Sequence, residues 1–320
     1  MRLHHFRHMA TGVVMALLVC LFPAPARAKR LNILMFMWQG ETGTEKGFKE
    51  ALAQEFVDQN INYTVLDVYK DVNRLKDLID QTDQTQYQLI YTYGSTITSR
   101  VAKAYTKTPI VFNKVLDPIG YRIIESWDSK QPNLTGVSIA IPTSLQIELM
   151  HKVFGAGNIG LIYSPTDKGS MELKEEMEAI LEKKGMELIS FEFTKNFTSL
   201  GAYVDRIAGR VSCIYLPTDR DVVGYIERIF STVNRRQIPT CMTSTSVLER
   251  GGTLCISVDY AEVGKMAGKL AAKVLSGTSP ADLPVMRPTE AETRLYANAH
   301  VLKKLKMELP KELNIQYIGK

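Results

Sequence analysis

The sequence predicts an α/β protein of two lobes, each a parallel β-sheet covered by helices. Short apolar runs alternate with amphipathic helical segments along most of the chain, and the alternation begins again after Gly136. Strands that alternate with helices pair in parallel, because each helix returns the chain to the same edge of the sheet. With 320 residues, the chain is long enough for two domains of ordinary size.

The elements of the two series follow one another in a regular order. In the first series, strands are expected at 31–38, 61–69, 87–93 and 109–115, with helices at 44–56, 73–82 and 96–105. The two series join near 135–146, where a strand passes into a helix without a long linker. In the second series, strands are expected at 158–164, 186–193, 211–217, 238–243 and 252–260, with helices at 171–184, 199–209 and 222–234.

Two further helices indicate that the chain crosses between the lobes more than once. The helix expected at 260–277 follows a completed second lobe, so we expect it to return to the first, and a last helix at 298–310 to return to the second. The first lobe would then comprise 29–141 plus about 260–285, and the second 142–259 plus about 286–320. Several short crossings form a hinge, because each can absorb backbone rotation.

The first 28 residues have the organisation of a secretory signal peptide. A positive start precedes the apolar core 9–22, and Ala26-Arg27-Ala28 is an A-x-A cleavage site. We expect cleavage after Ala28 and a mature protein in the periplasm or an equivalent extracytoplasmic space. Lipidation of Cys20 is an alternative, although Val19 stands where a lipoprotein signal needs a small residue.

Composition and charge exclude several classes of function. Hydrophobic residues make up 45% and charged residues 23%, as in globular proteins. Removal of Arg2, Arg7 and Arg27 leaves 36 basic against 34 acidic residues, a net charge of about +2, too small for general binding to nucleic acid. Three cysteines remain at 213, 241 and 255, each in an expected strand; buried free thiols are favoured over a Cys241–Cys255 disulfide.

The sequence lacks the motifs of the common enzyme classes. "GAGNIG" (155–160) matches G-x-G-x-x-G, but it follows a helix and precedes a strand, the reverse of the order that a dinucleotide site needs. No P-loop, G-x-S-x-G or H-E-x-x-H string is present, and only His151 and His300 follow the signal peptide. We therefore expect no catalytic residues, no cofactor and no metal site.

Polar residues gather where the expected strands end. Carboxyl ends of parallel strands are the edge at which open α/β sheets bind ligands, so these loops predict a binding site between the lobes. The candidate ligand-binding residues are Trp38, Gln39, Tyr93, Gly94, Ser95, Thr96, Asp117, Ser164, Thr166, Asp167, Thr218, Asp219 and Arg220.

Most of these candidates also have a purely structural explanation. Ser95, Asp167 and Asp219 stand at helix starts, where any of them could be an N-cap. Asp117 precedes Pro118 and favours a turn by itself. Trp38 leaves an apolar strand, so it is either a core residue or a surface on which a ligand stacks.

Several strings resemble one known family. "TPIVFNKVLDPIG", "PNLTGVS", "IGLIYSPTDKGS", "IYLPTDRDVV", "PADLPV" and the segment 238–277 are similar to the ABC-transporter substrate-binding proteins that include tryptophan- and tyrosine-binding members, in the expected order over the whole mature chain. The resemblance implies a type I periplasmic binding protein, with two Rossmann-like lobes with parallel sheets, joined by a multi-segment hinge, that deliver a ligand to a membrane permease.

The resemblance also implies roles for particular residues. The loop that matches Gly94-Ser95-Thr96 faces the ligand carboxylate, the aspartate that matches Asp219 faces the amino group, and Asp259 borders the cleft. Three departures concern the ligand: Arg220 replaces a common Asn, "QPN" replaces Gly-Gly-Asn, and "MWQGETG" differs from the usual first loop.

The sequence thus predicts a monomeric, exported solute receptor that binds a small ligand, such as an amino acid with an aromatic or apolar side chain. Asp219 would accept a hydrogen bond from a ligand cation, Ser95 and Thr96 would hold an anion, and Trp38 or Tyr93 would stack on the flat part. The alternative is a sensory protein that docks on a receptor kinase or chemoreceptor. An enzyme that uses the carboxylates is a third hypothesis, for which no residue spacing gives support.

Overall fold

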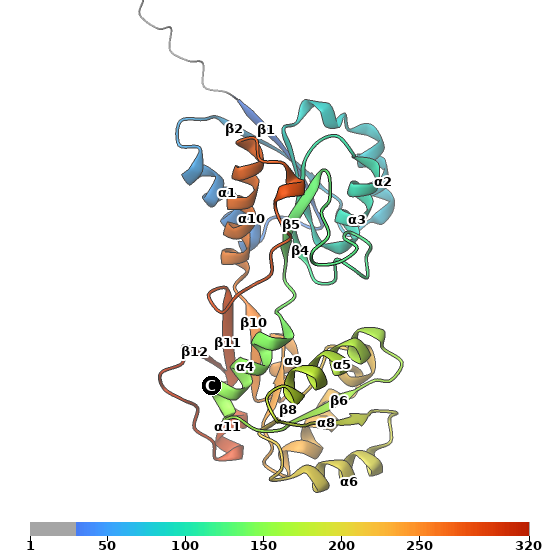
Figure 1. Ribbon diagram of the computed structural model, residues 1–320, viewed down its shortest axis with the longest axis vertical. Helices are drawn as coiled ribbons and strands as arrows, with labels where there is room; N and C mark the ends of the chain where they lie inside the picture. The colour runs from blue at the N-terminus through green and yellow to red at the C-terminus, as the bar shows by residue number, and fades with distance from the viewer. Residues whose placement is uncertain (1–29, 320) are drawn as a thin grey trace, which may run out of the picture.

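Two sheets form the centres of two lobes, which lie one above the other along the long axis of the molecule (Figure 1). The computed structural model describes residues 30–319. The first sheet has the order β2-β1-β3-β4-β5, and every pair in it is parallel. Its strands are β1 (Leu31–Met37), β2 (Ile61–Asp67), β3 (Leu89–Tyr93), β4 (Ile110–Val115) and β5 (Leu134–Ser138).

The second sheet has the order β12-β11-β10-β9-β8-β6-β7. Its strands are β6 (Ile159–Tyr163), β7 (Leu188–Glu192), β8 (Cys213–Tyr215), β9 (Thr240–Met242), β10 (Leu254–Val258), β11 (Thr293–Asn298) and β12 (Ile315–Ile318). The strands predicted from 158 to 260 are confirmed as a parallel set.

Two strands, β11 and β12, depart from the wholly parallel sheets that the sequence predicts. β11, which the periodicity did not reveal, pairs antiparallel with β10, and β12 then pairs parallel with β11. The direction follows from the path of the chain. β10 runs toward the hinge and leaves the second lobe there, whereas β11 enters from the hinge and must run away from it.

The helices cover both sheets. They are α1 (Gly43–Glu55), α2 (Val72–Gln81), α3 (Gly94–Ala104), α4 (Thr143–Phe154), α5 (Lys168–Glu182), α6 (Phe197–Ile207), α7 (Arg220–Gly224), α8 (Ile226–Asn234), α9 (Thr245–Leu248), α10 (Tyr260–Leu275) and α11 (Ala299–Leu305). The prediction of a single helix at 222–234 was wrong. Tyr225 leaves helical geometry, with φ −121° and ψ 20°, and separates α7 from α8. The last helix is shorter than predicted and ends at Leu305, because the next residue, Lys306, is a left-handed C-cap with φ +52°.

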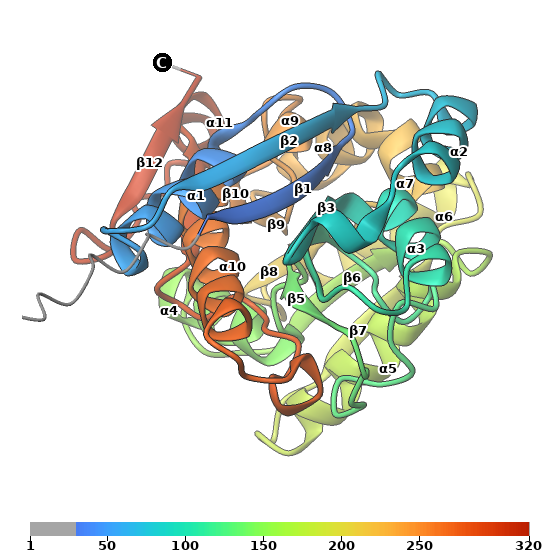
Figure 2. The same ribbon diagram turned by 90° about the horizontal axis from the view of Figure 1, so that it is seen from above.

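Helix α10 lies beside α1 in the first lobe, although β10 before it belongs to the second sheet (Figures 1 and 2). The close approach depends on glycine. A Cβ atom on Gly264 would lie 2.0 Å from the carbonyl oxygen of Thr44, and one on Gly47 would lie 2.1 Å from that of Ala261. Helix α10 therefore packs against α1 of the first lobe.

The returning chain touches the first sheet again before it enters β11. Met286 donates its N–H to the carbonyl of Gly136 over 2.9 Å and accepts from Ser138 over 2.9 Å, beside β5. Arg287 then donates from Nε to the carbonyl of Ala140 over 3.2 Å. The outgoing and returning segments thus run together between the lobes.

Cys213, Cys241 and Cys255 are buried free thiols. Cys241 packs into the cluster on one face of the sheet with Cys213, whereas Cys255 packs into the cluster on the opposite face. Because Cys241 and Cys255 point to opposite faces, they do not form a disulfide, and the favoured prediction of free thiols is confirmed.

Between Arg30 and Gly319, no helix has the length and apolar character needed to cross a membrane. The expected signal peptide, its cleavage site after Ala28 and Cys20 lie outside the described residues.

Candidate functional site

The carboxyl ends of the parallel strands in the two lobes face the same hinge. β5 leads into the first crossing at its carboxyl end, and β10 leads into another crossing at Asp259. Every strand parallel to β5 or β10 therefore also ends on the hinge side of its sheet. The loops that the sequence singled out lie along these two facing edges.

Helix α3 begins at the first of these edges without a side-chain cap. Its N-cap residue is Tyr93, and no side chain accepts a hydrogen bond from its first turn. The alternative that Ser95 is an N-cap was therefore wrong. Gly94 has φ +76°, and Ser95 and Thr96 are partly buried in the first turn. The first N–H groups of a helix have no partner within the helix and favour an anion.

The ring of Tyr93 faces a cation. Lys114, in β4, places Nζ 4.9 Å from the centroid of the Tyr93 ring and 4.5 Å from that of Tyr260, at the start of α10. Lys114 has φ +55°, and the pairing of β4 with β5 shifts register between Phe112 and Val115. Tyr93 is a candidate ligand-binding residue from the sequence, and in the structure its ring contacts the ammonium of Lys114.

The loop after β1 is fixed from within the first lobe. Trp38 is partly buried against the cluster that includes Phe36, whereas Gln39 is exposed. The N–H of Gly40 donates to Asp67, and Thr42 forms a capping box with the buried Glu45 at the start of α1. Trp38 therefore contacts the core, as a core residue would. It also stands at the end of β1, where a ligand could stack on it.

Asp117 forms the turn that its sequence favours. Its Oδ1 accepts a hydrogen bond from the N–H of Gly120 over 2.7 Å, and the residue is exposed. The hydrogen bond within the turn therefore accounts for an aspartate at position 117.

In the second lobe, Asp219 is buried and holds three segments together. It is 5% exposed. Its Oδ1 accepts from the N–H of Val222 over 2.7 Å, and its Oδ2 accepts from the N–H of Ser164 over 3.1 Å and from Oγ of Ser170 over 3.0 Å. The carboxylate caps α7 and also joins this loop to the loop after β6.

A second carboxylate, Asp221, lies beside this group. It pairs with Nζ of Lys195 at 3.1 Å and accepts a hydrogen bond from Oγ of Ser164 over 3.3 Å, while Thr166 shares a hydroxyl contact of 2.9 Å with Ser164. The hydrogen bond from Lys195 holds the pKa of the Asp221 carboxyl below its ordinary value. Asp221 was not among the residues predicted from the sequence, although it stands two residues after Asp219 at the same helix start.

The other candidates of the second lobe differ in their surroundings. Asp167 caps α5 by accepting from the N–H of Ser170 over 2.8 Å. Thr218 and Arg220 are exposed on either side of Asp219. Asp259 caps α10 by accepting from the N–H groups of Ala261 and Glu262, and its Oδ2 pairs with Arg294 at 3.0 Å. Asp259 therefore holds the hinge together.

The facing loops are not bonded to one another. Within residues 30–319, no hydrogen bond or ion pair links 38–42 or 93–96 with 164–167 or 218–221. Over the same range, no group of three His, Cys, Asp or Glu side chains is placed to hold a metal ion.

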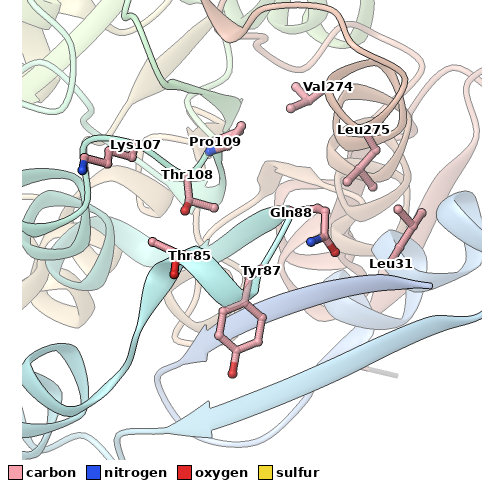
Figure 3. Close-up of a pocket in the computed structure, with 9 residues that line it drawn as sticks. All are labelled: Leu31, Thr85, Tyr87, Gln88, Lys107, Thr108, Pro109, Val274 and Leu275. Carbon is pink, nitrogen blue, oxygen red and sulfur yellow. The ribbon is translucent and has the colours of Figure 1, made fainter. Parts of the chain in front are cut away.

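A hollow of about 410 Å³ lies at the other edge of the first sheet. Its lining comes from the amino ends of β1, β3 and β4 and from the end of α10 (Figure 3). The residues that line it are Leu31, Thr85, Tyr87, Gln88, Lys107, Thr108, Pro109, Val274 and Leu275. None of the candidate residues belongs to it.

The two-lobed fold resembles solved solute-binding structures. A ligand-free, open structure of a substrate-binding protein with adhesive properties from Clostridium difficile gives a TM-score of 0.75 at 20% identity, covering 91% of this chain and 99% of that one. An ABC domain in complex with L-tryptophan from Streptococcus pneumonia gives 0.60 at 22% identity, covering 91% and 100%. These similarities establish the fold, an α/β architecture of two lobes.

Sequence comparison identifies the family. The family model of ABC transporter substrate binding proteins matches residues 33–317. A tyrosine-binding protein of Clostridioides difficile (strain R20291) is 25% identical over 277 residues, which are 86% of this chain and 79% of that protein. The chain belongs to the ABC transporter substrate-binding proteins, which bind solutes and are not enzymes.

Proposed function

We propose that this protein is the extracytoplasmic receptor of an ABC importer, that it acts as a monomer, and that it closes its two lobes on an amino acid with an aromatic or apolar side chain. The observation that carries the proposal is the opposition of two polar edges: an uncapped helix start in the first lobe and a pair of carboxylates in the second. An amino acid has a carboxylate for the first and an ammonium group for the second.

The carboxylate would bind at the start of α3. The main-chain N–H groups of Gly94, Ser95 and Thr96, with the two hydroxyls, offer donors beside the positive end of the helix. The left-handed φ of Gly94 supports this role, because it directs the chain from β3 into the helix with no side chain at the turn.

The ammonium group would bind beside Asp219. A carboxylate has about four lone-pair positions, and Asp219 uses three of them within the protein. One position remains for a charge-assisted hydrogen bond, with Asp221 adding negative charge nearby. Thr166, Asp167, Thr218 and Arg220 would border this side, and Trp38, Gln39 and Asp117 the other; Asp259 would border the cleft at the hinge.

Closure would rotate the lobe formed by 29–141 and about 260–285 against the lobe formed by 142–259 and about 286–320. The lack of bonds between the facing loops of the described chain leaves this rotation free, while the crossings supply the hinge. The tyrosine-binding relative and the L-tryptophan complex support an amino acid as ligand. No observation favours docking on a receptor kinase.

The test begins with native mass spectrometry of the purified protein, followed by thermal-shift screening of amino acids, nucleosides and sugars. A micromolar ligand corresponds to a binding free energy of about −8 kcal/mol and raises the melting temperature in a concentration-dependent way. We expect an aromatic or apolar amino acid to do so. Stabilisation by sugars or nucleosides alone would overturn the proposal.

A pair of variants tests the helix start. Ser95→Pro removes one main-chain N–H in the first turn, where proline is tolerated, and Ser95→Ala removes only the hydroxyl. If the N–H groups hold the carboxylate, Ser95→Pro weakens amino acid binding by about tenfold or more, because one charge-assisted hydrogen bond is lost. Ser95→Ala should weaken binding less. Equal affinities for both variants and the unchanged protein, all folded, would contradict this assignment.

A further inference from the structure

The side chain of Lys114 is held in a position that the strand itself does not require. Its Nζ lies between two tyrosine rings, 4.9 Å from the centroid of Tyr93 and 4.5 Å from that of Tyr260. Other lysines that lie over tyrosines also pair with acids: Lys49 with Glu41 and Lys195 with Asp221. Among the described residues, no carboxylate lies within 4.0 Å of the Lys114 ammonium.

The backbone directs this side chain to the edge that faces the second lobe. Lys114 is the next-to-last residue of β4, and its φ of +55° coincides with the register shift between β4 and β5. A non-glycine residue in the left-handed region is uncommon and costs conformational free energy. Without this shift, successive side chains of β4 would alternate across the sheet, and the side chain of residue 114 would point to the face opposite Asn113.

The clamp formed by Tyr93, Lys114 and Tyr260 lies next to the start of α3. Tyr93 is the N-cap residue of that helix, and a Cβ atom on Gly94 would lie 4.0 Å from the carbonyl oxygen of Lys114. Lys114 is partly buried, and Tyr260 is 40% exposed. An ammonium group without an acid partner thus stands beside an uncapped helix start, so two sources of positive potential meet at one edge.

We propose that Lys114 binds the acid group of the ligand, and that the two tyrosine rings hold its ammonium in place for that purpose. The inference rests on the proposed amino acid binding and narrows it. Recognition of the acid would depend on a fixed cation in addition to the main-chain N–H groups of α3. The ligands are then organic acids in their ionised form, and neutral analogues such as amides bind more weakly.

The tyrosine rings suit this role for a physical reason. The face of an aromatic ring attracts a cation but offers no hydrogen-bond acceptor, so the three N–H donors of the lysine stay available. An acid partner would neutralise the charge and occupy a donor. Fixing the long side chain before the ligand arrives also lowers the conformational entropy that binding would otherwise cost.

The arrangement changes the role predicted for Tyr93. One face of its ring contacts Lys114, so Tyr93 acts first as a positioning residue for the cation. The flat part of an aromatic ligand would then find its surface elsewhere at the edge, where Trp38 is the remaining candidate from the sequence.

The experiment measures how strongly the protein prefers an acid to its amide. Calorimetric affinities are determined for L-tyrosine, L-tryptophan and L-leucine, for their carboxamides, and for 3-(4-hydroxyphenyl)propionate and its amide. The proteins are the unchanged chain, Lys114→Met, Lys114→Arg and the control Lys107→Met. Lys107 is exposed before the amino end of the same strand, so its removal deletes an equal charge at the opposite edge.

We expect the unchanged protein and Lys107→Met to prefer the acid by about tenfold or more, and Lys114→Met to lose most of that preference. Lys114→Arg, which keeps the charge and stacks on aromatic rings, should retain part of it. The ratio separates a contact with the ligand from a structural role, because a loosened pocket would weaken binding of acid and amide alike. Thermal unfolding establishes that each variant is folded.

The other outcomes distinguish this inference from the proposed function. If the acid preference is the same in Lys114→Met as in the unchanged protein, the role of Lys114 is wrong and amino acid binding stands. If amino acids do not bind but the propionate does, and Lys114→Met abolishes its acid preference, amino acid binding is wrong and the role of Lys114 stands. If no acid binds the unchanged protein, both are overturned.

Discussion

Ser164 donates its main-chain N–H to Oδ2 of Asp219 over 3.1 Å, so the carboxylate that begins α7 also fixes the end of β6. The same oxygen accepts the hydroxyl of Ser170 in the first turn of α5. One buried side chain therefore determines how two strand-end loops of the second lobe lie relative to each other. This geometry makes Asp219 a structural residue before any ligand arrives.

Replacement of Asp219 should lower stability as well as ligand affinity. Asp219→Asn can still cap α7 through its amide oxygen, but its NH₂ group cannot accept from the N–H of Ser164. A buried donor left without a partner costs about 1–3 kcal/mol, so the free energy of unfolding in urea should fall by that amount. Asp219→Ala also loses the cap, which adds about 1 kcal/mol.

Asp167→Ala provides the matched control. Asp167 caps α5 through a single hydrogen bond to Ser170 and is less buried than Asp219. Its loss should therefore cost only about 1 kcal/mol, the usual value of an N-cap. A loss of stability in Asp167→Ala as large as that in Asp219→Asn would contradict the structural role assigned to Asp219.

Strand β10 could be predicted from the sequence, whereas its neighbour β11 could not. Periodicity located β10 because its residues are buried on both faces of the sheet and form a continuous apolar run. β11 escaped notice, and its direction depends on where the chain returns through the hinge, which no local pattern encodes. Tyr225 is a similar case: its ring packs against Phe193 and Phe197, and the helix there is interrupted.

The candidate site shows the same limit. Asp219 and Ser164 could be assigned to one edge from sequence, because carboxyl ends of parallel strands share an edge. Lys114 could not be recognised, since the ring that completes its surroundings belongs to Tyr260, which reaches the first lobe only after the chain has built most of the second. The burial of Asp219 also depends on Ser170, a contact between separate loops.

The contact between α1 and α10 should not tolerate a methyl group. In Gly264→Ala the new Cβ would lie 2.0 Å from the carbonyl oxygen of Thr44, a backbone atom that cannot move without separating the helices. Overpacking of this kind costs about 1–3 kcal/mol. We expect the melting temperature to fall, although alanine is intrinsically the better residue in a helix.

Gly201→Ala should change stability in the opposite direction. Gly201 lies within α6, and a Cβ atom there would have nothing within 4 Å, so only the intrinsic preference remains. This substitution should stabilise the protein by about 0.5–1 kcal/mol. If both alanine variants shift the melting temperature in the same direction, the close approach of α1 and α10 is not the reason that Gly264 is needed.

The three described cysteines should be unreactive in the native protein. Burial raises the pKa of the Cys213 and Cys255 thiols to about 12 and that of Cys241 well above its ordinary value, so the reactive thiolate is nearly absent at pH 8. With residues 1–28 removed, a thiol-reactive chromogenic disulfide should label none of the three in buffer and all three in urea. Labelling of fewer than three in urea without reductant would indicate a disulfide and contradict the placement of Cys241 and Cys255 on opposite faces.

Arg287 couples the hinge to the first lobe, and a double-mutant cycle measures the coupling. Its guanidinium lies 4.4 Å above the ring of Trp127, and its Nε bonds the carbonyl of Ala140. Burial lowers the pKa of Arg287, so this cation is partly withdrawn from water. An interaction between a cation and a ring is stronger when the cation is withdrawn from water.

Arg287→Ala and Trp127→Ala should each lower the free energy of unfolding, measured in urea by circular dichroism. The double variant should lose about 1–2 kcal/mol less than the sum of the two single losses. The exposed Arg228 places its guanidinium carbon 3.7 Å from the ring centroid of the partly buried Phe197, and this pair should show a coupling of only about 0.5–1 kcal/mol. Equal coupling energies in the two cycles would mean that burial at the hinge adds nothing to the contact between Arg287 and Trp127.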